Sequence, residues 1–153
     1  MQPAAPLSVP AEYHELTARV QALLYAADHI GHAVEALELR RLILAVDEAL
    51  MRVHVWERSA LFPLIAHRCA PLRPVLDRLH RSQRPDAPAR KDLLLAVDLW
   101  ARSGECELAA FARLREYSET CLGHLQVVKD YVLPVAADYL SPEDWSRVAV
   151  DLQ

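Results

Sequence analysis

The sequence has no asparagine and only three glycines among its 153 residues, so it is poor in the residues that make tight turns. No stretch shows the strict alternation of apolar and polar residues, bounded by turn residues, that predicts a strand. We therefore expect an all-α protein. The three cysteines are scattered and form no disulfide framework. Because the N-terminus also lacks the pattern of a secretory signal, we expect the protein in the reducing cytoplasm.

Charge and hydropathy exclude further classes of protein. Lysine and arginine number 17 and aspartate and glutamate 21, which gives a net charge of -4 and no basic surface for nucleic acid. No apolar run is long enough to span a bilayer. We expect a soluble protein without a nucleic-acid or membrane partner. Its length suits a single domain over residues 1–153, in which residues 1–10 form a flexible N-terminus.

Prolines and polar caps divide the chain into segments. Pro71 and Pro74 follow a long apolar helical pattern, and RPDAP at residues 84–88 interrupts the next helical pattern. Ser103-Gly104 precedes the last long helical pattern. Ser141, followed by Pro142, is typical of the N-cap of a short final helix. These signals predict long helices over about 11–28, 33–68, 73–102 with a break at 83–89, and 104–140. Four such helices favour an antiparallel up-down four-helix bundle, to which the short C-terminal helix is added.

The segment HVWERSALFP, residues 54–63, places a carboxylate in an apolar helical stripe. The stripe recurs at steps of three and four and consists of Val46, Leu50, Val53, Glu57, Ala60 or Leu61, and Leu64. His54 lies on the same side of the helix, three residues before Glu57. Because an unpaired carboxylate is costly in a core of low dielectric constant, a cation, a set of hydrogen-bond donors or a proton must accompany Glu57.

The segment HLQVVKDYVLPVAA, which begins at His124, repeats this order of a histidine, an apolar turn and a proline. Counting residues from the expected turns places His54 and His124 at one level of the bundle. His14 on the first helix and His80 on the third fall in the same layer. Imidazoles and a carboxylate from facing helices suit iron, zinc or manganese. The candidate metal ligands are therefore His14, His54, Glu57, His80 and His124. The alternative for each histidine is a half-buried side chain bonded to a backbone carbonyl.

At these residues the chain resembles the hemerythrin-like family, also called the HHE cation-binding domain, from about Tyr13 to Tyr139. The resemblance rests on one histidine per helix, on Glu57 and Pro63 after His54, and on a proline after His124. It implies a four-helix bundle with a non-haem iron site of one or two metals. It also implies binding or sensing of oxygen, nitric oxide or iron, or storage of iron. Zinc or manganese would suit the same ligands.

The chain departs from the family's pattern at both acidic positions. The family's first acid lies four residues after its histidine, where this chain has Arg58, and Glu57 stands one residue early. The matching positions after His124 hold Val127 and Val128. These departures favour a single metal, or none, over a pair.

Two alternatives stay open from the sequence. His29 or His32 takes the place of His14 if the first helix is read in another register. A metal-free scaffold or protein-interaction module of the same fold is the alternative function. Since no hydrolase or nucleotide-binding signature occurs, a binding role is favoured over an enzymatic one.

Overall fold

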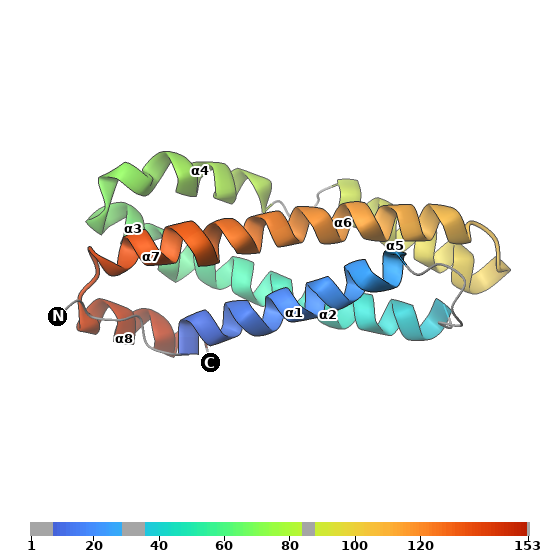
Figure 1. Ribbon diagram of the computed structural model, residues 1–153, viewed down its shortest axis with the longest axis horizontal. Coiled ribbons are helices and arrows are strands. Elements are labelled where there is room, and N and C mark those ends of the chain that lie inside the picture. Colours follow the sequence, from blue (N-terminus) through green and yellow to red (C-terminus); the bar gives the residue numbers. More distant parts are fainter. Residues whose placement is uncertain (1–7, 29–35, 84–87, 153) are drawn as a thin grey trace.

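The computed structural model describes residues 8–28, 36–83 and 88–152, and every regular element in these ranges is helical (Figure 1). The predicted all-α class is therefore confirmed for the described residues. In chain order the elements are α1 (Ser8–Asp28), α2 (Ala36–Trp56), the π turn η1 (Glu57–Leu61), α3 (Phe62–Arg68), the 3-10 turn η2 (Ala70–Leu72), α4 (Arg73–Ser82), α5 (Pro88–Ser103), α6 (Glu107–Val127), the π turn η3 (Val128–Val132), α7 (Leu133–Ala137) and α8 (Pro142–Val150).

The prediction of a flexible N-terminus over residues 1–10 is corrected at residues 8–10, which are helical. Helix α1 already begins at Ser8, while residues 1–7 lie outside the described residues. Val9 is fully buried and so anchors this first turn in the core. Pro10 does not hinder it, because the first N–H groups of a helix have no partner within the helix.

The long helices α1, α2, α5 and α6 lie side by side along the molecule (Figure 1). Helix α1 packs against α2 and α6, and α5 also packs against α2 and α6. Neighbouring helices in this arrangement run in opposite directions. Helices α2 and α6 therefore run in the same direction and meet only across the interior.

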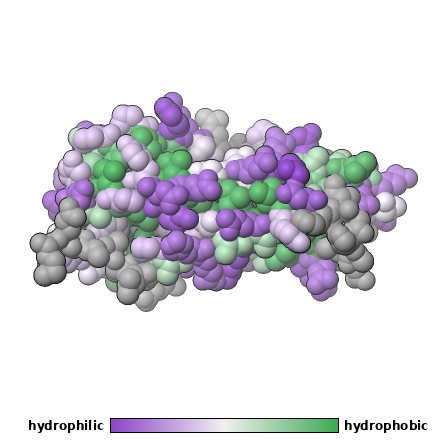
Figure 2. Space-filling model, viewed as in Figure 1, coloured by the Kyte–Doolittle hydropathy of each residue, from purple (hydrophilic) through white to green (hydrophobic). Residues whose placement is uncertain are grey.

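Apolar residues at helical spacing form the interior. On α1 the buried stripe follows steps of four and three and consists of Val9, Tyr13, Leu16, Val20 and Leu23. Helix α8 joins this core through Trp145, which is 1% exposed. The indole Nε1 of Trp56 donates to the carbonyl oxygen of Val148 at 2.8 Å, which ties α8 to the end of α2. Figure 2 shows hydrophilic side chains over much of the outer face, with apolar patches between them. Among the described helices, none combines the length and apolar character needed to cross a bilayer.

Each of the two π turns ends two residues before a proline. In η1 the N–H of Phe62 donates to the carbonyl of Glu57, and in η3 the N–H of Leu133 donates to the carbonyl of Val128. The next residues, Pro63 and Pro134, have no N–H to donate, and their rings would clash with the carbonyl four residues back. The wider π turn accommodates the proline without ending the helix. Glu57 is the first residue of η1, so one of these turns begins at the buried carboxylate.

The predicted N-cap of the final helix is confirmed by a capping box. The Ser141 hydroxyl accepts from the Asp144 N–H at 3.1 Å, and the Asp144 carboxylate accepts from the Ser141 N–H at 3.1 Å. We expect Ser141→Ala to lower the free energy of unfolding by about 1 kcal/mol, because one N–H at the helix start loses its partner. Urea denaturation measures this change. Ser146→Ala is the control, since this exposed hydroxyl only bonds back to the Pro142 carbonyl. Equal effects of the two substitutions would show that the cap contributes nothing.

Candidate metal centre

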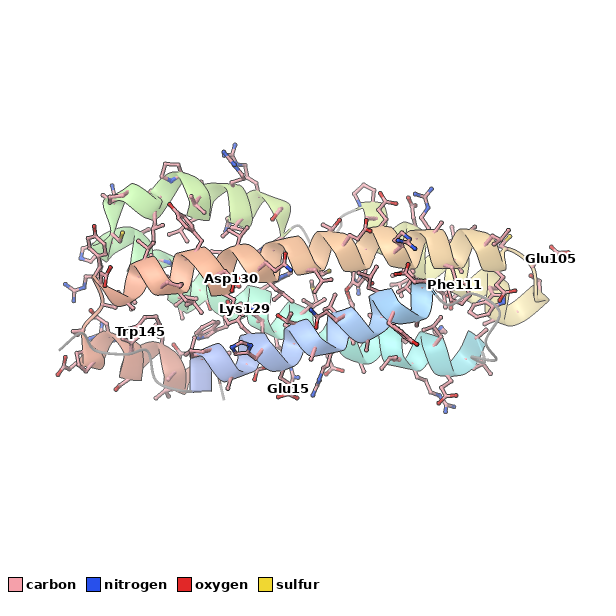
Figure 3. The ribbon with its side chains drawn as sticks, in the orientation of Figure 1. Glu15, Glu105, Phe111, Lys129, Asp130 and Trp145 are labelled. Carbon is pink, nitrogen blue, oxygen red and sulfur yellow. The ribbon has the colours of Figure 1, made fainter. Side chains whose placement is uncertain are left out.

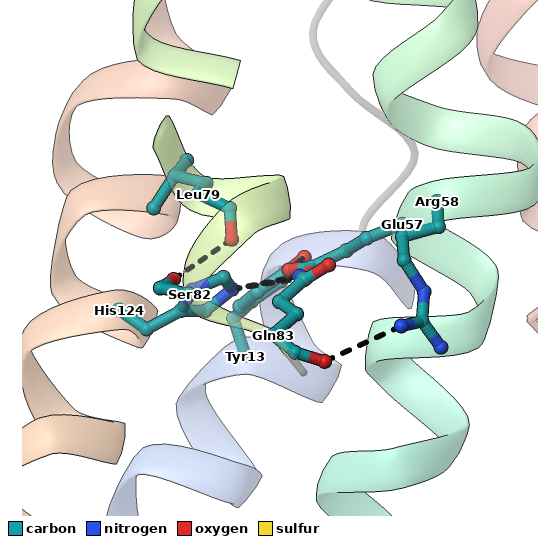
Figure 4. A network of polar contacts seen from close by, with 7 residues as sticks. All are labelled: Tyr13, Glu57, Arg58, Leu79, Ser82, Gln83 and His124. Atoms are coloured by element: carbon teal, nitrogen blue, oxygen red, sulfur yellow. Dashed lines mark hydrogen bonds and ion pairs between the residues drawn. The ribbon is translucent and has the colours of Figure 1, made fainter. Parts of the chain in front are cut away.

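The buried carboxylate of Glu57 is the centre of a polar cluster inside the apolar core (Figure 4). Glu57 is 0% exposed. Its Oε1 accepts a hydrogen bond from the Tyr13 hydroxyl, and its Oε2 accepts one from Nε2 of Gln83. Nε2 of His124 lies 3.0 Å from the same Oε2. Both carboxylate oxygens thus have partners, and these come from α1, the end of α4 and α6.

Tyr13 reaches Glu57 because it belongs to the buried stripe of α1. Burial, and then the negative charge of Glu57, raise the pKa of Tyr13 well above its usual value. The phenol therefore keeps its proton and acts as a donor. It also packs against Trp56, with the ring centroids 6.4 Å apart. Tyr13 thus fixes the position of the carboxylate from the α1 side.

Gln83 directly follows α4 and is buried. Its N–H donates to the His80 carbonyl at 3.3 Å, and its own carbonyl accepts from Nη1 of Arg58 at 3.3 Å. These backbone contacts hold the side chain between Glu57 and His124 (Figure 4). Nε2 of Gln83 is 3.2 Å from Nε2 of His124, and Oε1 of Gln83 has no partner within the described part of the chain.

His54 and His124 bring two imidazoles together across the core. Their ring centroids are 4.9 Å apart, and the ring planes meet at 62°. Neither ring nitrogen of His54 has a hydrogen-bond partner among the residues that the structure describes. Burial lowers the pKa of His54 to about 4, so at neutral pH its imidazole is uncharged. A neutral imidazole is the form that binds a metal.

The described residues contain one cluster in which three ligand atoms lie within 4.8 Å of one another, and it consists of His54, Glu57 and His124. Two imidazoles and one carboxylate match the ligand set that holds mononuclear non-haem iron with coordination positions left open. The cluster fits a metal chemically, because the buried nitrogens of His54 would gain a partner there. Of the five residues predicted as ligands, the structure brings together these three.

His14 and His80 do not join the cluster, which corrects the expectation of one layer with a histidine from each helix. Both side chains are exposed. On each helix the residue that reaches Glu57 is instead a member of the buried stripe, Tyr13 on α1 and Gln83 after α4. The stripe that leads to Gln83 follows steps of four, three and four, and it consists of Leu72, Leu76, Leu79 and Gln83. The buried stripe of α1 contains Tyr13, and one further step of the stripe on α4 reaches Gln83.

His29 and His32, the alternatives to His14, lie outside the described residues. Asp130, the acid nearest to His124 in the sequence after it, is exposed on η3 (Figure 3). Its Oδ1 lies 3.8 Å from Nζ of its neighbour Lys129. The chain therefore offers no second acid to the cluster from this turn.

A second polar pair joins α2 and α6 seven residues before the two histidines. The Tyr117 hydroxyl donates to Oδ1 of Asp47 at 3.0 Å, just as His54 and His124 meet further along the same helices. Asp47 is buried and also accepts from Arg90 of α5, through Nε at 2.9 and 3.0 Å and through Nη2 at 2.7 Å. Seven residues are two helical turns, or roughly 10 Å. The two contacts therefore fix the register of α2 against α6.

Comparison of the chain with protein-family models, with curated proteins and with solved structures finds no match. What the site can do is therefore argued from its own geometry.

The buried imidazole of His54 makes stability depend on pH in metal-free protein. Its pKa is about 4 in the folded chain and about 6.5 in the unfolded chain. Between these values the unfolded chain binds more protons, so the free energy of unfolding falls as the pH drops from about 6.5 to about 4 and then levels off. The loss attributable to His54 is at most roughly 3 kcal/mol.

This prediction is checked by urea denaturation across that pH range in the presence of a chelator. His54→Leu should flatten the pH dependence relative to the unsubstituted protein. His67→Leu is the matched control, because His67 is exposed on α3. An unchanged slope in His54→Leu would mean that the imidazole titrates alike in both states.

Proposed function

We propose that this protein binds one transition-metal ion through His54, Glu57 and His124. Non-haem iron is the proposed metal, and zinc or manganese suits the same ligands. The observation that supports this most is the fully buried acid beside two imidazoles, one of which has two nitrogens without a partner in the described chain. Three protein ligands leave coordination positions free, so the proposed role is binding or sensing of a small molecule such as oxygen or nitric oxide, or handling of iron.

The proposal also concerns the fold and the family of the chain. We propose that the helices form an up-down four-helix bundle of the hemerythrin-like type, in which α2 and α6 carry the ligands. The antiparallel neighbours and the two prolines after the two histidines support this assignment. A single metal is preferred to a pair, because the described residues place one carboxylate in the cluster. When bound, the metal would supply a Lewis-acidic or redox-active centre.

Residues of the chain itself hold the proposed ligand groups in position. Tyr13 and Gln83 hold the two oxygens of Glu57, so the carboxylate keeps its place without a metal. Nε2 of His124 faces both Glu57 and Gln83, and its tautomer decides whether it donates to the acid or accepts from the amide. Binding of a cation at this nitrogen requires that the nitrogen itself carry no proton.

The donor set of Glu57 supports a second candidate function, a metal-free scaffold or interaction module. Tyr13, Gln83 and His124 give both oxygens of the acid a partner, so the carboxylate needs no cation for its burial. Under this alternative the polar cluster only specifies how the helices pack. The two functions differ in whether the protein holds stoichiometric metal.

We expect protein purified without added metal or affinity tag to contain about one metal ion per chain. His54→Ala and His124→Ala should each abolish stoichiometric binding, because each removes one of three ligands. Metal analysis with an ultraviolet-visible spectrum measures this. His14→Ala and His80→Ala are matched controls, since both histidines are exposed and lie outside the cluster. Full occupancy in both cluster variants would contradict the proposal.

Chelation separates the two functions in the unsubstituted protein. A bound metal adds its binding free energy to the stability of the fold, so a chelator should lower the melting temperature. The same chelator should leave the melting temperature of His54→Ala unchanged. If iron, zinc and manganese cannot raise a low metal content and the chelator has no effect on the unsubstituted protein, the metal-free alternative is correct.

A further inference from the structure

The side-chain amide of Gln83 lies between two of the three proposed ligands (Figure 4). Its Nε2 donates to Oε2 of Glu57 and is 3.2 Å from Nε2 of His124. The two ligand atoms are themselves 3.0 Å apart. Gln83 and Glu57 are both buried, so the protein and not bulk water fixes this arrangement. Polar atoms from η1, the end of α4 and α6 thus meet at one point.

The amide and a metal ion need the same acceptor sites. An imidazole nitrogen has one lone pair, which accepts a hydrogen bond or binds a metal but cannot do both. Nε2 is the His124 nitrogen that faces Glu57, and the Gln83 amide is the donor within its reach among the described residues. A metal that binds Nε2 and Oε2 at about 2 Å takes this lone pair and repels the N–H dipole. Metal and amide therefore exclude each other.

The Gln83 side chain has space into which it can turn. It lines a cavity of about 340 Å³ between α2, α4, α5 and α6, beside the cluster. The exposed residues of the cavity lining are Arg78, Ser82, Glu119, Thr120, Gly123 and Val127. Because these residues are exposed, an amide that turns from Glu57 toward them reaches water.

Such a movement requires rotation of the side chain only. The backbone of Gln83 is held separately, since its N–H donates to the His80 carbonyl and its carbonyl accepts from Nη1 of Arg58, both at 3.3 Å. In its buried position Oε1 of Gln83 has no partner among the described residues, which costs free energy. Water at the exposed side of the cavity would give Oε1 a partner. This gain offsets part of the loss of the amide contact with Glu57.

We propose that Gln83 competes with the metal for Glu57 and His124, and that metal binding displaces its side chain toward the cavity. Gln83 then acts as a positioning residue, which holds the ligand groups in metal-free protein and lowers the affinity of the site. The metal therefore binds reversibly. This inference rests on the proposed function, because it requires that Glu57 and His124 hold the metal.

Gln83→Leu tests the competition, because leucine is similar in size and has no donor. We expect this variant to bind Zn²⁺ at least about tenfold more tightly than the unsubstituted protein, since the metal no longer displaces a hydrogen bond to a charged group. Competition with a chromophoric chelator, on full chains without an affinity tag, measures both dissociation constants. Gln21→Leu is the matched control, because Gln21 is exposed on α1. Its affinity should be unchanged.

Melting temperatures distinguish competition from packing and from ligation. Gln83→Leu should lower the melting temperature in the presence of a chelator and lower it much less at saturating Zn²⁺, because the amide contact exists only without metal. A packing role would lower both values alike and leave the Zn²⁺ affinity unchanged. A ligand role would weaken Zn²⁺ binding. Either result would overturn the proposal. If Gln83→Leu does not fold, Gln83→Ala replaces it, since water can then occupy the place of the amide.

Nuclear magnetic resonance follows the displacement directly in the unsubstituted protein. The side-chain amide signals of Gln83 are assigned by their absence from the spectrum of Gln83→Leu. Zn²⁺ is diamagnetic, and its binding should shift these signals and speed up the exchange of the amide protons with water. Signals that keep their shifts and their slow exchange at saturating Zn²⁺ would show that the amide stays beside Glu57, contrary to the proposal.

The same titrations separate this inference from the proposed function. Zn²⁺ binding by Gln83→Leu but not by the unsubstituted protein would support the competition and contradict the proposed function. Zn²⁺ binding by the unsubstituted protein with no gain in Gln83→Leu would do the reverse. If neither protein binds Zn²⁺, both proposals are wrong.

Discussion

The burial of the Glu57 carboxylate is the constraint on which the arrangement of the helices depends. A carboxylate without solvent or partners would cost several kcal/mol, which is a large part of the stability of a domain of this size. Its partners come from α1, the end of α4 and α6. Each of these segments must therefore take one position along the bundle and one rotation about its own axis. A purely apolar core would tolerate sliding of one helix past another by a fraction of a turn. This core does not, because a shift would leave a buried oxygen unpaired.

Pro63 and Pro134 serve the same constraint from α3 and α7, the segments that continue α2 and α6 beyond the π turns. Both helices continue through a π turn ahead of a proline, and both turns lie just beyond the paired histidines. In a regular α-helix, Pro63 would remove one backbone hydrogen bond and its ring would clash with the carbonyl four residues back. If the helix ended at this point instead, α3 would no longer have to continue in the direction of α2. The π turn keeps the axis and changes the rotation of the residues that follow. Together with the Asp47 and Tyr117 contact two turns earlier, it fixes how α2 and α6 face each other.

Much of this was accessible from the sequence, and the two failures have different causes. The helical class, the capping box at Ser141 and the place of Glu57 in the core stripe follow from spacing and local chemistry, and the structure has them. The layer of four histidines does not follow, because counting along helices gives depth but not rotation. An error of one residue turns a side chain by about 100°. Tyr13 and His14 differ by that one residue, and only the stripe on α1 distinguishes them. Gln83 was missed for another reason: a search for ligands looks for histidine and acids, and an amide that holds a carboxylate gives no such signal.

The cluster and the cavity together oppose the reading of this core as packing alone. Burying polar groups without partners costs about 1–3 kcal/mol each, and empty volume next to them adds to this cost. Leucine or methionine at position 54 would remove unpartnered nitrogens and fill space, and alanine at position 123 would strengthen α6. The chain has His54 and Gly123 instead, and both line the same cavity. Local choices that reduce stability at one place, in a chain that otherwise follows the rules of helix packing, are expected at a binding site. The unpaired imidazole beside the buried acid is therefore what the proposed ligand binding would explain and what the fold alone does not require.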